Sequence, residues 1–471
     1  MLLVIEAVMF LVCAMVSLAY GDSALGPMFI SAGVTAVAGL LLSFLIRGTT
    51  RNLSRRDGYV VVSLSWVALT AFGTLPFLVG GYVSSLTDAF FETMSGFTST
   101  GATVINHIDT LPHGLLFWRS LMQWVGGLGI ILFTIAVLPI FGVNGLQVFA
   151  AESGATKRDK IHPRIGVAAR YLLSMYVGLT VALALLLRVG GMDLFDSICH
   201  SFCTLSTGGF STHQDSIAYF NSPFIEYVIS IFMFIGGINF TLLLMLTRRR
   251  FARVWHDAEL RWYVGSVLIF TFALCCVLYR TEPYGLETSF RKSLFQVVSL
   301  HTSTGFAVDD YMLWVPFTWG LMLVLMVSGA CSGSTSGGLK CVRLVILSRV
   351  VRNELKRILH PNAVLPVRIG QRQVVAPQTV STVLAFCAVY CALVVFGILF
   401  MLCMGMGFDE AIGCSVSCLG NMGPGLGEVG PAASWSDIPA ACKWLCSVYM
   451  LLGRLELFTL LLMLTPGFWR K

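Results

Sequence analysis

Long apolar runs alternate with short ones along the chain. Ten runs approach the roughly 20 apolar residues that a helix needs to cross a membrane. They are Leu2–Tyr20, Pro27–Ile46, Gly58–Tyr82, Leu115–Ile140, Gly166–Val189, Pro223–Thr247, Trp262–Tyr279, Pro316–Leu347, Thr379–Met406 and Pro439–Leu464. Four runs are too short to cross and suit re-entrant half-helices. These are Leu86–Phe97, Leu194–Thr204, Thr288–His301 and Asp409–Cys418.

Each short run leads into a polar loop that contains a glycine. The four loops are Thr98-Ser99-Thr100-Gly101, Leu205-Ser206-Thr207-Gly208, Thr302-Ser303-Thr304-Gly305 and Gly420-Asn421-Met422-Gly423, and their glycines are 107, 97 and 118 residues apart. The repeated unit is therefore helix, half-helix, loop, helix. The pattern predicts an all-α integral membrane fold with four pseudo-repeats around a central pore, preceded by a two-helix hairpin.

The predicted segments divide the chain into one hairpin and four repeats. The hairpin takes residues 1–57, and the repeats take 58–156, 157–261, 262–376 and 377–471. The first run lacks a basic segment ahead of it and contains Glu6, so we expect a retained membrane helix and not a signal peptide.

Composition supports a membrane class. Hydrophobic residues make up 56% of the chain and charged residues only 12%, whereas soluble domains carry about 25% charged residues. Segments between the apolar runs are shorter than an ordinary soluble domain of ~100 residues. We therefore expect a single membrane domain.

Basic residues gather at five places that ten spans would put on one face. These clusters hold 24 of the 31 Lys and Arg residues, at Arg47–Arg56, Lys157–Arg170, Arg248–Arg261, Lys340–Arg372 and Arg470-Lys471. The excess of positive charge in cytoplasmic loops makes that face cytoplasmic, with both termini inside. The cluster Lys340–Arg372 suits contact with anionic membrane lipid, and a docking surface for a cytosolic regulator is the alternative.

The four loops have the chemistry of a cation site. Backbone carbonyls that converge on an axis can replace the hydration shell of a monovalent cation. A half-helix also directs the partial negative charge of its carboxyl end towards the centre. The loops contain no Lys or Arg, which disfavours anions. The ligands would be the carbonyls of Thr100, Thr207, Thr304 and Met422.

The chain resembles the Trk/Ktr/HKT superfamily of potassium transporters, most closely the TrkH type. The resemblance covers nearly the whole sequence. It rests on the stretches Asp88–Thr103, His200–His213, Gly423–Gly427, Gln123–Gly129, Ile235–Phe240 and Leu452–Glu456. The additional amino-terminal hairpin is similar to the TrkH type and unlike the shorter Ktr type.

This resemblance implies potassium uptake through a gated pore in a bacterial inner membrane, with potassium as the bound ion and no organic cofactor. A glycine in each filter loop governs potassium preference in the family, and all four are present here as Gly101, Gly208, Gly305 and Gly423. The fourth loop departs from Ser-Thr-Gly, which leaves a sodium or weakly selective pathway open. The resemblance also implies a homodimer and a peripheral nucleotide-binding Trk A-type subunit.

Two features indicate a gate below the filter. Small residues interrupt the run Pro316–Leu347, and we expect a non-helical gating loop formed by Gly333, Ser334, Thr335, Ser336, Gly337, Gly338 and Lys340. Close helix packing by small residues is the alternative. Arg454 lies near the middle of the last predicted span, where a charge is costly. We expect it to face the cavity below the filter, with a pairing to Glu6 or another helix as the alternative.

Other chemistry finds little support. The fourteen cysteines lie in apolar stretches without histidine clusters, and cysteine packs there as a small hydrophobe. The histidines form no cluster, and His200 and His301 are expected to pack behind the filter. No nucleophile–base pair indicates an enzyme, and no nucleic-acid partner is expected. The sequence leaves open whether transport is passive or a symport with protons or sodium.

Overall fold

The computed structural model describes residues 1–45, 55–136, 162–370 and 373–470. The regular structure in these ranges is helical apart from two short strands, β1 (Arg368–Ile369) and β2 (Gln373–Val374), which pair antiparallel. The predicted all-α fold is confirmed. The predicted boundary at residues 156 and 157 lies outside the described residues, and the division into repeats stays a prediction.

Six helices in the described ranges are long and apolar enough to cross a membrane. They are α1 (Leu2–Tyr20), α2 (Leu25–Leu45), α3 (Arg55–Gly73) continued by α4 (Leu75–Val79), α8 (His162–Val189), α13 (Ala258–Thr281) and α17 (Pro377–Cys403). Each corresponds to one of the ten predicted spans. Their length and apolar surface make the chain an integral membrane protein.

Four half-helices lie between the longer ones. They are α5 (Leu86–Phe97), α9 (Leu194–Leu205), α14 (Leu286–His301) and α18 (Phe408–Gly420). Their bounds lie within two residues of the predicted short runs. Each packs against the long helix that precedes it, as α9 packs against α8 and α14 against α13. Each half-helix is therefore supported along one side by the long helix ahead of it.

A further helix follows each half-helix. They are α6 (His113–Ala136), α10 (Pro223–Gly236), α15 (Pro316–Ser328) and α19 (Ala440–Arg454). The predicted run Leu115–Ile140 extends past the last described residue of α6. The other three predicted spans are broken, which corrects the expectation that Pro223–Thr247 and Pro439–Leu464 are continuous.

In the second repeat, α10 meets α11 (Phe240–Thr247) at an angle of 103°. The side chain of Asn239 caps α11 by accepting a hydrogen bond from the Thr241 N–H at 2.8 Å. The Phe240 N–H donates to the carbonyl of Gly333 at 3.1 Å, and the Cys331 N–H donates to the carbonyl of Gly237, also at 3.1 Å. The loop of the third repeat thus satisfies the backbone groups that the break exposes.

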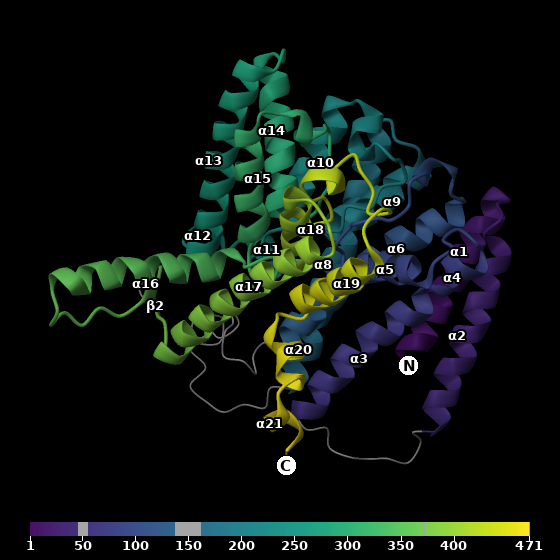
Figure 1. The fold of residues 1–471 in the computed structure, drawn as a ribbon, viewed down its shortest axis with the longest axis horizontal. Helices are drawn as coiled ribbons and strands as arrows, with labels where there is room; N and C mark the ends of the chain where they lie inside the picture. The colour runs from purple at the N-terminus through teal and green to yellow at the C-terminus, as the bar shows by residue number, and fades with distance from the viewer. Residues whose placement is uncertain (46–54, 137–161, 371–372, 471) are drawn as a thin grey trace.

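In the third repeat, residues 329–340 are non-helical and separate α15 from α16 (Cys341–Leu359). Figure 1 shows α16 running out to one side, across the direction of α13, α14 and α15. The predicted run Pro316–Leu347 is therefore not one span. The expected interruption is present, and it turns the chain out of the bundle.

The last predicted span breaks after Arg454, which is the final residue of α19 and not a mid-helix residue. Glu456 and Leu457 have positive φ values of 59° and 27°, and α20 (Phe458–Met463) follows. Left-handed backbone of this kind cannot continue an α-helix of L-residues. The break brings Arg454 and Glu456 to the end of a helix, where their side chains can reach neighbouring loops.

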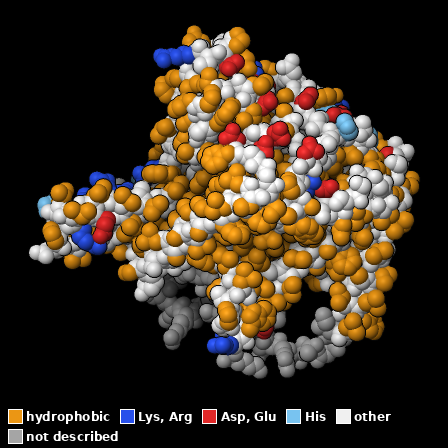
Figure 2. All heavy atoms as spheres, viewed as in Figure 1, with side chains coloured by type: hydrophobic (Ala, Val, Ile, Leu, Met, Phe, Trp, Pro, Cys, Tyr) orange, Lys and Arg blue, Asp and Glu red, His pale blue; other side chains and the backbone are white. Residues whose placement is uncertain are grey.

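The other described elements are short and lie in the connections or, for the last of them, at the carboxyl end. They are η1 (Ile108–Thr110), η3 (Ser216–Phe220), η4 (Tyr311–Leu313), η5 (Gly427–Val429), α12 (Phe251–Trp255) and α21 (Pro466–Trp469). Figure 2 shows hydrophobic side chains covering the face around α17 and α19, with acidic side chains gathered above this band and basic ones on α16. A broad apolar band with most charged side chains outside it is typical of a protein embedded in lipid.

The amino-terminal hairpin packs against the first repeat. Gly21 ends α1 with φ of 67°, and Asp22 follows in the turn. One carboxylate oxygen of Asp22 accepts from the Ala24 N–H at 3.1 Å, and the other accepts from the Gly114 N–H of α6 at 3.0 Å. A single turn residue therefore fixes the hairpin to the helix that follows the first half-helix.

Candidate functional site

The four half-helices end in the same backbone conformation. The residue after the helix cap has left-handed backbone in the first three repeats, and the cap itself has it in the fourth. These residues are Ser99, Thr207, Ser303 and Asn421, with φ of 51°, 52°, 55° and 53°. Two residues further on, a glycine has positive φ, at Gly101, Gly209, Gly305 and Gly423, with φ of 90°, 78°, 82° and 91°. Such values favour glycine strongly because it has no Cβ.

This pattern corrects the predicted register of the second loop by one residue. The Gly208 N–H donates to the carbonyl of Cys203 at 2.9 Å, just as the Thr100 N–H donates to Ser95 at 2.8 Å. Gly208 is therefore equivalent to Thr100, and Gly209 is equivalent to Gly101. Leu205 is the last residue of α9 and lies outside the loop. The error arose because Thr207-Gly208-Gly209 offers two glycines, and the first one fits the Ser-Thr-Gly pattern.

The four loops close into a ring around one axis. A Cβ built on Gly101 would lie 2.1 Å from the carbonyl oxygen of Gly208, and one on Gly209 would lie 2.0 Å from that of Thr304. A Cβ on Gly305 would lie 2.1 Å from the carbonyl oxygen of Met422, and one on Gly423 would lie 2.8 Å from that of Thr100. Each loop thus lies against the next, and no larger residue fits at these four glycines.

The ring carbonyls are those of Thr100, Gly208, Thr304 and Met422. Three belong to the predicted ligand set, and Gly208 replaces Thr207. Hydroxyl contacts join residues within the first and third loops. The hydroxyls of Thr98 and Thr100 lie 2.8 Å apart, and those of Thr302 and Thr304 lie 2.7 Å apart. The role of the carbonyls as ion ligands stays a prediction.

Asn421 links the fourth loop to the first. Its amide nitrogen donates to the Thr100 hydroxyl at 3.0 Å and to the carbonyl of Met450 on α19 at 2.8 Å. The Ser99 hydroxyl donates in the same way to the carbonyl of Gln123 on α6 at 3.1 Å. The loop that departs from Ser-Thr-Gly therefore has its polar side chain in the position where the first loop has serine.

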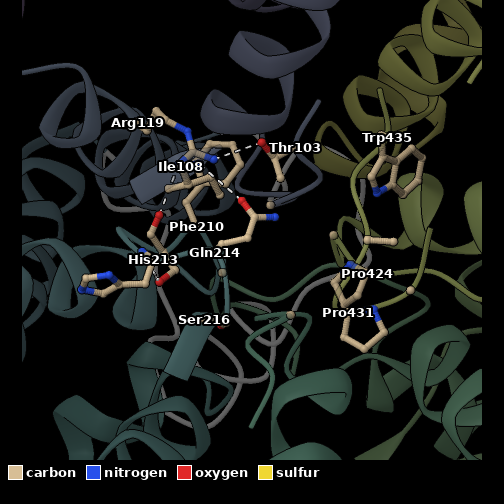
Figure 3. A pocket seen from close by; sticks show the side chains of 17 residues that line it. Thr103, Ile108, Arg119, Phe210, His213, Gln214, Ser216, Pro424, Pro431 and Trp435 are labelled. Carbon is tan, nitrogen blue, oxygen red and sulfur yellow. Dashed lines mark hydrogen bonds between the residues drawn. The ribbon is translucent and has the colours of Figure 1, made fainter. Parts of the chain in front are cut away.

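A small cavity opens on one side of the ring. It encloses about 60 Å³, and Gly101, Gly209, Gly305 and Gly423 line it together. Figure 3 shows Arg119, Phe210 and Gln214 on one side of this cavity, with Pro424, Pro431 and Trp435 across from them. The presence of all four positive-φ glycines at one opening is independent support for the corrected register.

A buried ion pair that the sequence reasoning missed holds the wall of this cavity. Arg119 on α6 contacts Glu92 on α5 at 2.9 Å, and their side chains are 1% and 0% exposed. The same guanidinium donates to the carbonyl of Ser211 and to the hydroxyl of Thr103, each at 3.2 Å. Because a buried pair needs additional hydrogen bonds to offset desolvation, these contacts make the pair tolerable. The sequence signal for this pair was that each residue is a charge within a predicted apolar run.

His213 lies in the loop after the second ring segment, outside the spanning helices. Its two ring nitrogens each lie 3.0 Å from a carboxylate, Asp109 on one side and Asp196 on the other. Only an imidazolium can donate to both at once. Burial lowers the pKa of His213, but the hydrogen bonds to Asp196 and Asp109 outweigh it and raise the pKa above its usual value. This histidine therefore ties the first two repeats together while it is charged.

Residues 329–340 form a loop directly beneath the ring. The Thr335 hydroxyl donates to the carbonyl of Leu205 at 3.2 Å, and the Gly337 N–H donates to the Ser303 hydroxyl at 2.7 Å. A Cβ on Gly337 would lie 2.1 Å from the carbonyl oxygen of Gly420. The loop thus contacts the third ring segment and the ends of the half-helices α9 and α18. Gly333, Ser334, Ser336 and Gly338 belong to the same loop.

Arg454 connects this loop to the first ring segment. Its guanidinium donates to the carbonyl of Thr335 at 2.9 Å, to the carbonyl of Gly126 at 2.8 Å and to the Ser99 hydroxyl at 3.2 Å. The side chain is 3% exposed. In the described part of the chain no carboxylate forms an ion pair with it, so the alternative pairing with Glu6 is wrong. The guanidinium is bound to the loop and does not project freely into a cavity.

The end of the loop is fixed by charges. Lys340 contacts Glu456 at 2.6 Å, and Arg343 on α16 pairs with the other oxygen of that carboxylate. Glu259 at the start of α13 accepts from the Ser332 N–H at 2.6 Å and from the Val342 N–H at 3.1 Å. Sequence reasoning missed Glu259, because only the folded chain brings the start of α13 to both ends of the loop.

The two histidines expected behind the filter are buried and hydrogen-bonded. A ring nitrogen of His200 lies 3.0 Å from the Ser211 hydroxyl. His301 lies 2.8 Å from the Ser266 hydroxyl through one nitrogen and 2.9 Å from the Ser328 hydroxyl through the other. These contacts give both rings a structural role.

The fold and the ring define a class: an integral membrane protein of the pore-loop type, in which re-entrant half-helices direct irregular backbone towards a shared axis. The chain belongs to the TrkH family. The family model, described as a cation transport protein, matches residues 27–469. The resemblance to the TrkH type is confirmed.

Known relatives cover nearly the whole chain. The chain is 41% identical over 464 residues to the Trk system potassium uptake protein TrkH of Escherichia coli K12, with 97% of this chain and 95% of that protein covered. It is 38% identical over 488 residues to the protein of the same name from Vibrio parahaemolyticus, with 100% and 98% covered. The crystal structure of the potassium transporter TrkH from Vibrio parahaemolyticus matches with a TM-score of 0.91 at 37% identity, covering 100% of this chain and 97% of that chain.

The bridge between Asp109, His213 and Asp196 predicts a pH-dependent stability. Because the folded-state pKa of His213 is raised, its contribution is complete below about pH 6.5, the usual histidine pKa, and is lost as the pH rises through the raised value. The bridge is partly exposed, so we expect a contribution of about 1 kcal/mol or less. Thermal unfolding of detergent-solubilised protein from pH 5.5 to 9 should lose this component in His213→Gln. An identical pH profile in the variant would contradict the assignment, and His256→Gln is the matched control.

Proposed function

We propose that this chain is the ion-conducting subunit of a Trk-type potassium uptake system. The observation that carries the proposal is the closed ring of four loops, in which each glycine lies against the carbonyl of the next segment. Backbone carbonyls arranged in this way can replace the hydration shell of a cation. The names of the relatives, which are potassium uptake proteins, support potassium as the transported ion.

The electrostatics of the ring favour cations. Each half-helix ends at the ring, so its carboxyl-terminal partial negative charge is directed there. Arg119 lines the adjacent cavity, but its charge is paired with Glu92. A sodium or weakly selective cation pathway is the alternative, because the Asn421-Met422-Gly423 segment differs from the other three. The proposal assigns no catalytic step and no organic cofactor to the chain.

The proposed setting is the bacterial inner membrane, with both termini and α16 on the cytoplasmic side. The helix α16 carries much of the basic cluster Lys340–Arg372, and positive charge is retained in the cytoplasm. Figure 1 has both chain ends in the lower part of the view, away from the tops of α13 and α14. Anionic lipid headgroups would contact this cluster.

The proposed partners are a second copy of the chain and a cytosolic nucleotide-binding Trk A-type subunit. The relatives are named as parts of a Trk system, which implies further components. The proposed gate is the loop at residues 329–340, because it contacts the ring from below and is held by Arg454, Glu456 and Glu259.

Ion flux tests the proposed function directly. Full-length protein in sealed vesicles should move potassium and rubidium down their gradients, and sodium more slowly. The measurement is isotope or fluorescent-indicator uptake, with and without an imposed proton gradient, which also distinguishes passive flux from symport. Vesicles that pass none of the three ions would exclude a pore. Equal rates for potassium and sodium would favour the alternative.

The corrected register predicts a ranking of two adjacent substitutions. In Gly209→Ala the new Cβ meets the backbone oxygen of Thr304, at a φ of 78° that alanine tolerates poorly. In Gly208→Ala the new Cβ meets the movable end of the Gln123 side chain. We expect Gly209→Ala to abolish selective flux and Gly208→Ala to retain part of it. The reverse ranking in the same assay would restore Gly208 as the filter glycine.

The contacts of Arg454 predict a leak when the guanidinium is removed. Arg454→Ala removes three hydrogen bonds that the charged guanidinium donates, and each such bond contributes about 1.5–3 kcal/mol. The loop should therefore open more often, and basal potassium flux should rise about tenfold or more. Arg188→Ala, at an exposed residue in the last turn of α8 that donates to the nearby Met192 carbonyl, is the control. Unchanged flux and unchanged gating in Arg454→Ala would refute the assigned gate contact.

A further inference from the structure

One side chain makes the ring chemically unequal. Gln123 on α6 is fully buried. Its amide nitrogen donates to the carbonyl of Gly208 at 2.8 Å, and its amide oxygen accepts from the Phe210 N–H at 3.1 Å. These two backbone groups flank Gly209. The orientation of the amide follows from chemistry, because a carbonyl needs a donor and an N–H needs an acceptor.

The hydrogen bond to Gly208 has no counterpart at the other corners. In the described residues, the ring carbonyls of Thr100, Thr304 and Met422 accept no hydrogen bond from a side chain. A carbonyl oxygen has two lone pairs, and the amide of Gln123 occupies one of them at Gly208. Three corners of the ring therefore present free carbonyls, and one presents a carbonyl that is already engaged.

The second loop has a glycine at the place where the side chain of Gln123 packs. The other three loops have a side chain at the ring position, whereas Gly208 has none. A Cβ there would lie 2.4 Å from the side-chain carbonyl carbon of Gln123. The missing side chain thus makes the space that the amide occupies.

The position on α19 that is equivalent to Gln123 on α6 holds an apolar residue. A Cβ on Gly126 of α6 would lie 1.9 Å from the carbonyl oxygen of Phe97, and one on Gly453 of α19 would lie 2.3 Å from that of Leu419. Gln123 and Met450 each precede that glycine by three residues, and each accepts a hydrogen bond at its backbone carbonyl from a ring-segment side chain. Methionine therefore stands in the fourth repeat where glutamine stands in the first.

We propose that Gln123 is a specificity-determining positioning residue, which orients the Gly208 carbonyl and weakens its field at the ion. This inference rests on the proposed function, since it assigns a role to a corner of the same ring. The number and field strength of the carbonyls set the preference between potassium and sodium. A stronger field favours the smaller ion, because that ion approaches the oxygens more closely. The amide of Gln123 therefore shifts the preference of the ring towards the larger cation.

The decisive variant is Gln123→Met, which copies the residue of the fourth repeat and removes both hydrogen bonds. Full-length protein in vesicles is measured for reversal potential with potassium on one side and sodium on the other. One net hydrogen bond changes an equilibrium by about three- to tenfold, so we expect the sodium-to-potassium permeability ratio to rise by that factor. A loss of folded protein alone would reduce the flux of all ions together and would leave the ratio unchanged.

A second variant keeps the test decisive if Gln123→Met does not fold. Gln123→Asn retains the amide but is one methylene shorter, so it reaches only one of the two backbone groups. Its permeability ratio should lie between those of the wild type and Gln123→Met. The matched control is Gln296→Met on α14, because Gln296 is also buried and its amide has no hydrogen-bond partner in the described residues. The control should keep the wild-type ratio.

The outcomes separate this inference from the proposed function. Wild-type vesicles that pass no potassium, rubidium or sodium would remove the pore and the inference with it. Selective wild-type flux with an unchanged ratio in folded Gln123→Met and Gln123→Asn would overturn the inference and leave the pore intact. An equal shift in Gln296→Met would also overturn it, because the effect would then belong to any buried glutamine behind the ring.

Discussion

The ring of four loops closes only because backbone meets backbone without a Cβ between them. At Gly101, Gly209 and Gly305 a methyl group would lie about 2 Å from the carbonyl oxygen of the next loop. This contact fixes how far each half-helix extends towards the axis. It also requires left-handed residues ahead of each glycine, which no regular helix can supply. The half-helices, the surrounding spans and the loop below are arranged around this contact.

Irregular backbone at membrane depth must find its hydrogen bonds inside the protein. Three long polar side chains from distant parts of the chain supply them here. Gln123 binds the second ring segment, Arg454 binds the loop beneath the ring, and Glu259 holds both ends of that loop. Gln123 and Arg454 are buried and Glu259 is half-buried, and each serves backbone groups of a different repeat. The polar residues of the apolar helices therefore hold the loops that the helices surround.

Much of the fold could be predicted from the apolar runs alone. The half-helices lie within two residues of their predicted bounds, because the length of an apolar run decides whether it can cross a membrane. The predictions failed where a local pattern had more than one solution. Thr207-Gly208-Gly209 allows two registers, and the helical hydrogen bonds of α9 select the second. Pro223–Thr247 and Pro439–Leu464 are apolar over most of their length, so hydropathy averaged over a run does not show the breaks at Asn239 and after Arg454.

The sequence by itself determined the class of the protein, the number of loops and the side chains that could not face lipid, because burial of apolar surface depends on composition and length. Composition also marked Arg454 as a charge within an apolar run and residues 328–340 as a stretch of small residues that interrupts one. Only the tertiary structure decided what they contact. Arg454 reaches Thr335 and Gly126, and Gln123 reaches a loop 85 residues away. Hydrogen bonds depend on distances of a few tenths of an ångström between remote residues, and no pattern along the chain encodes those distances.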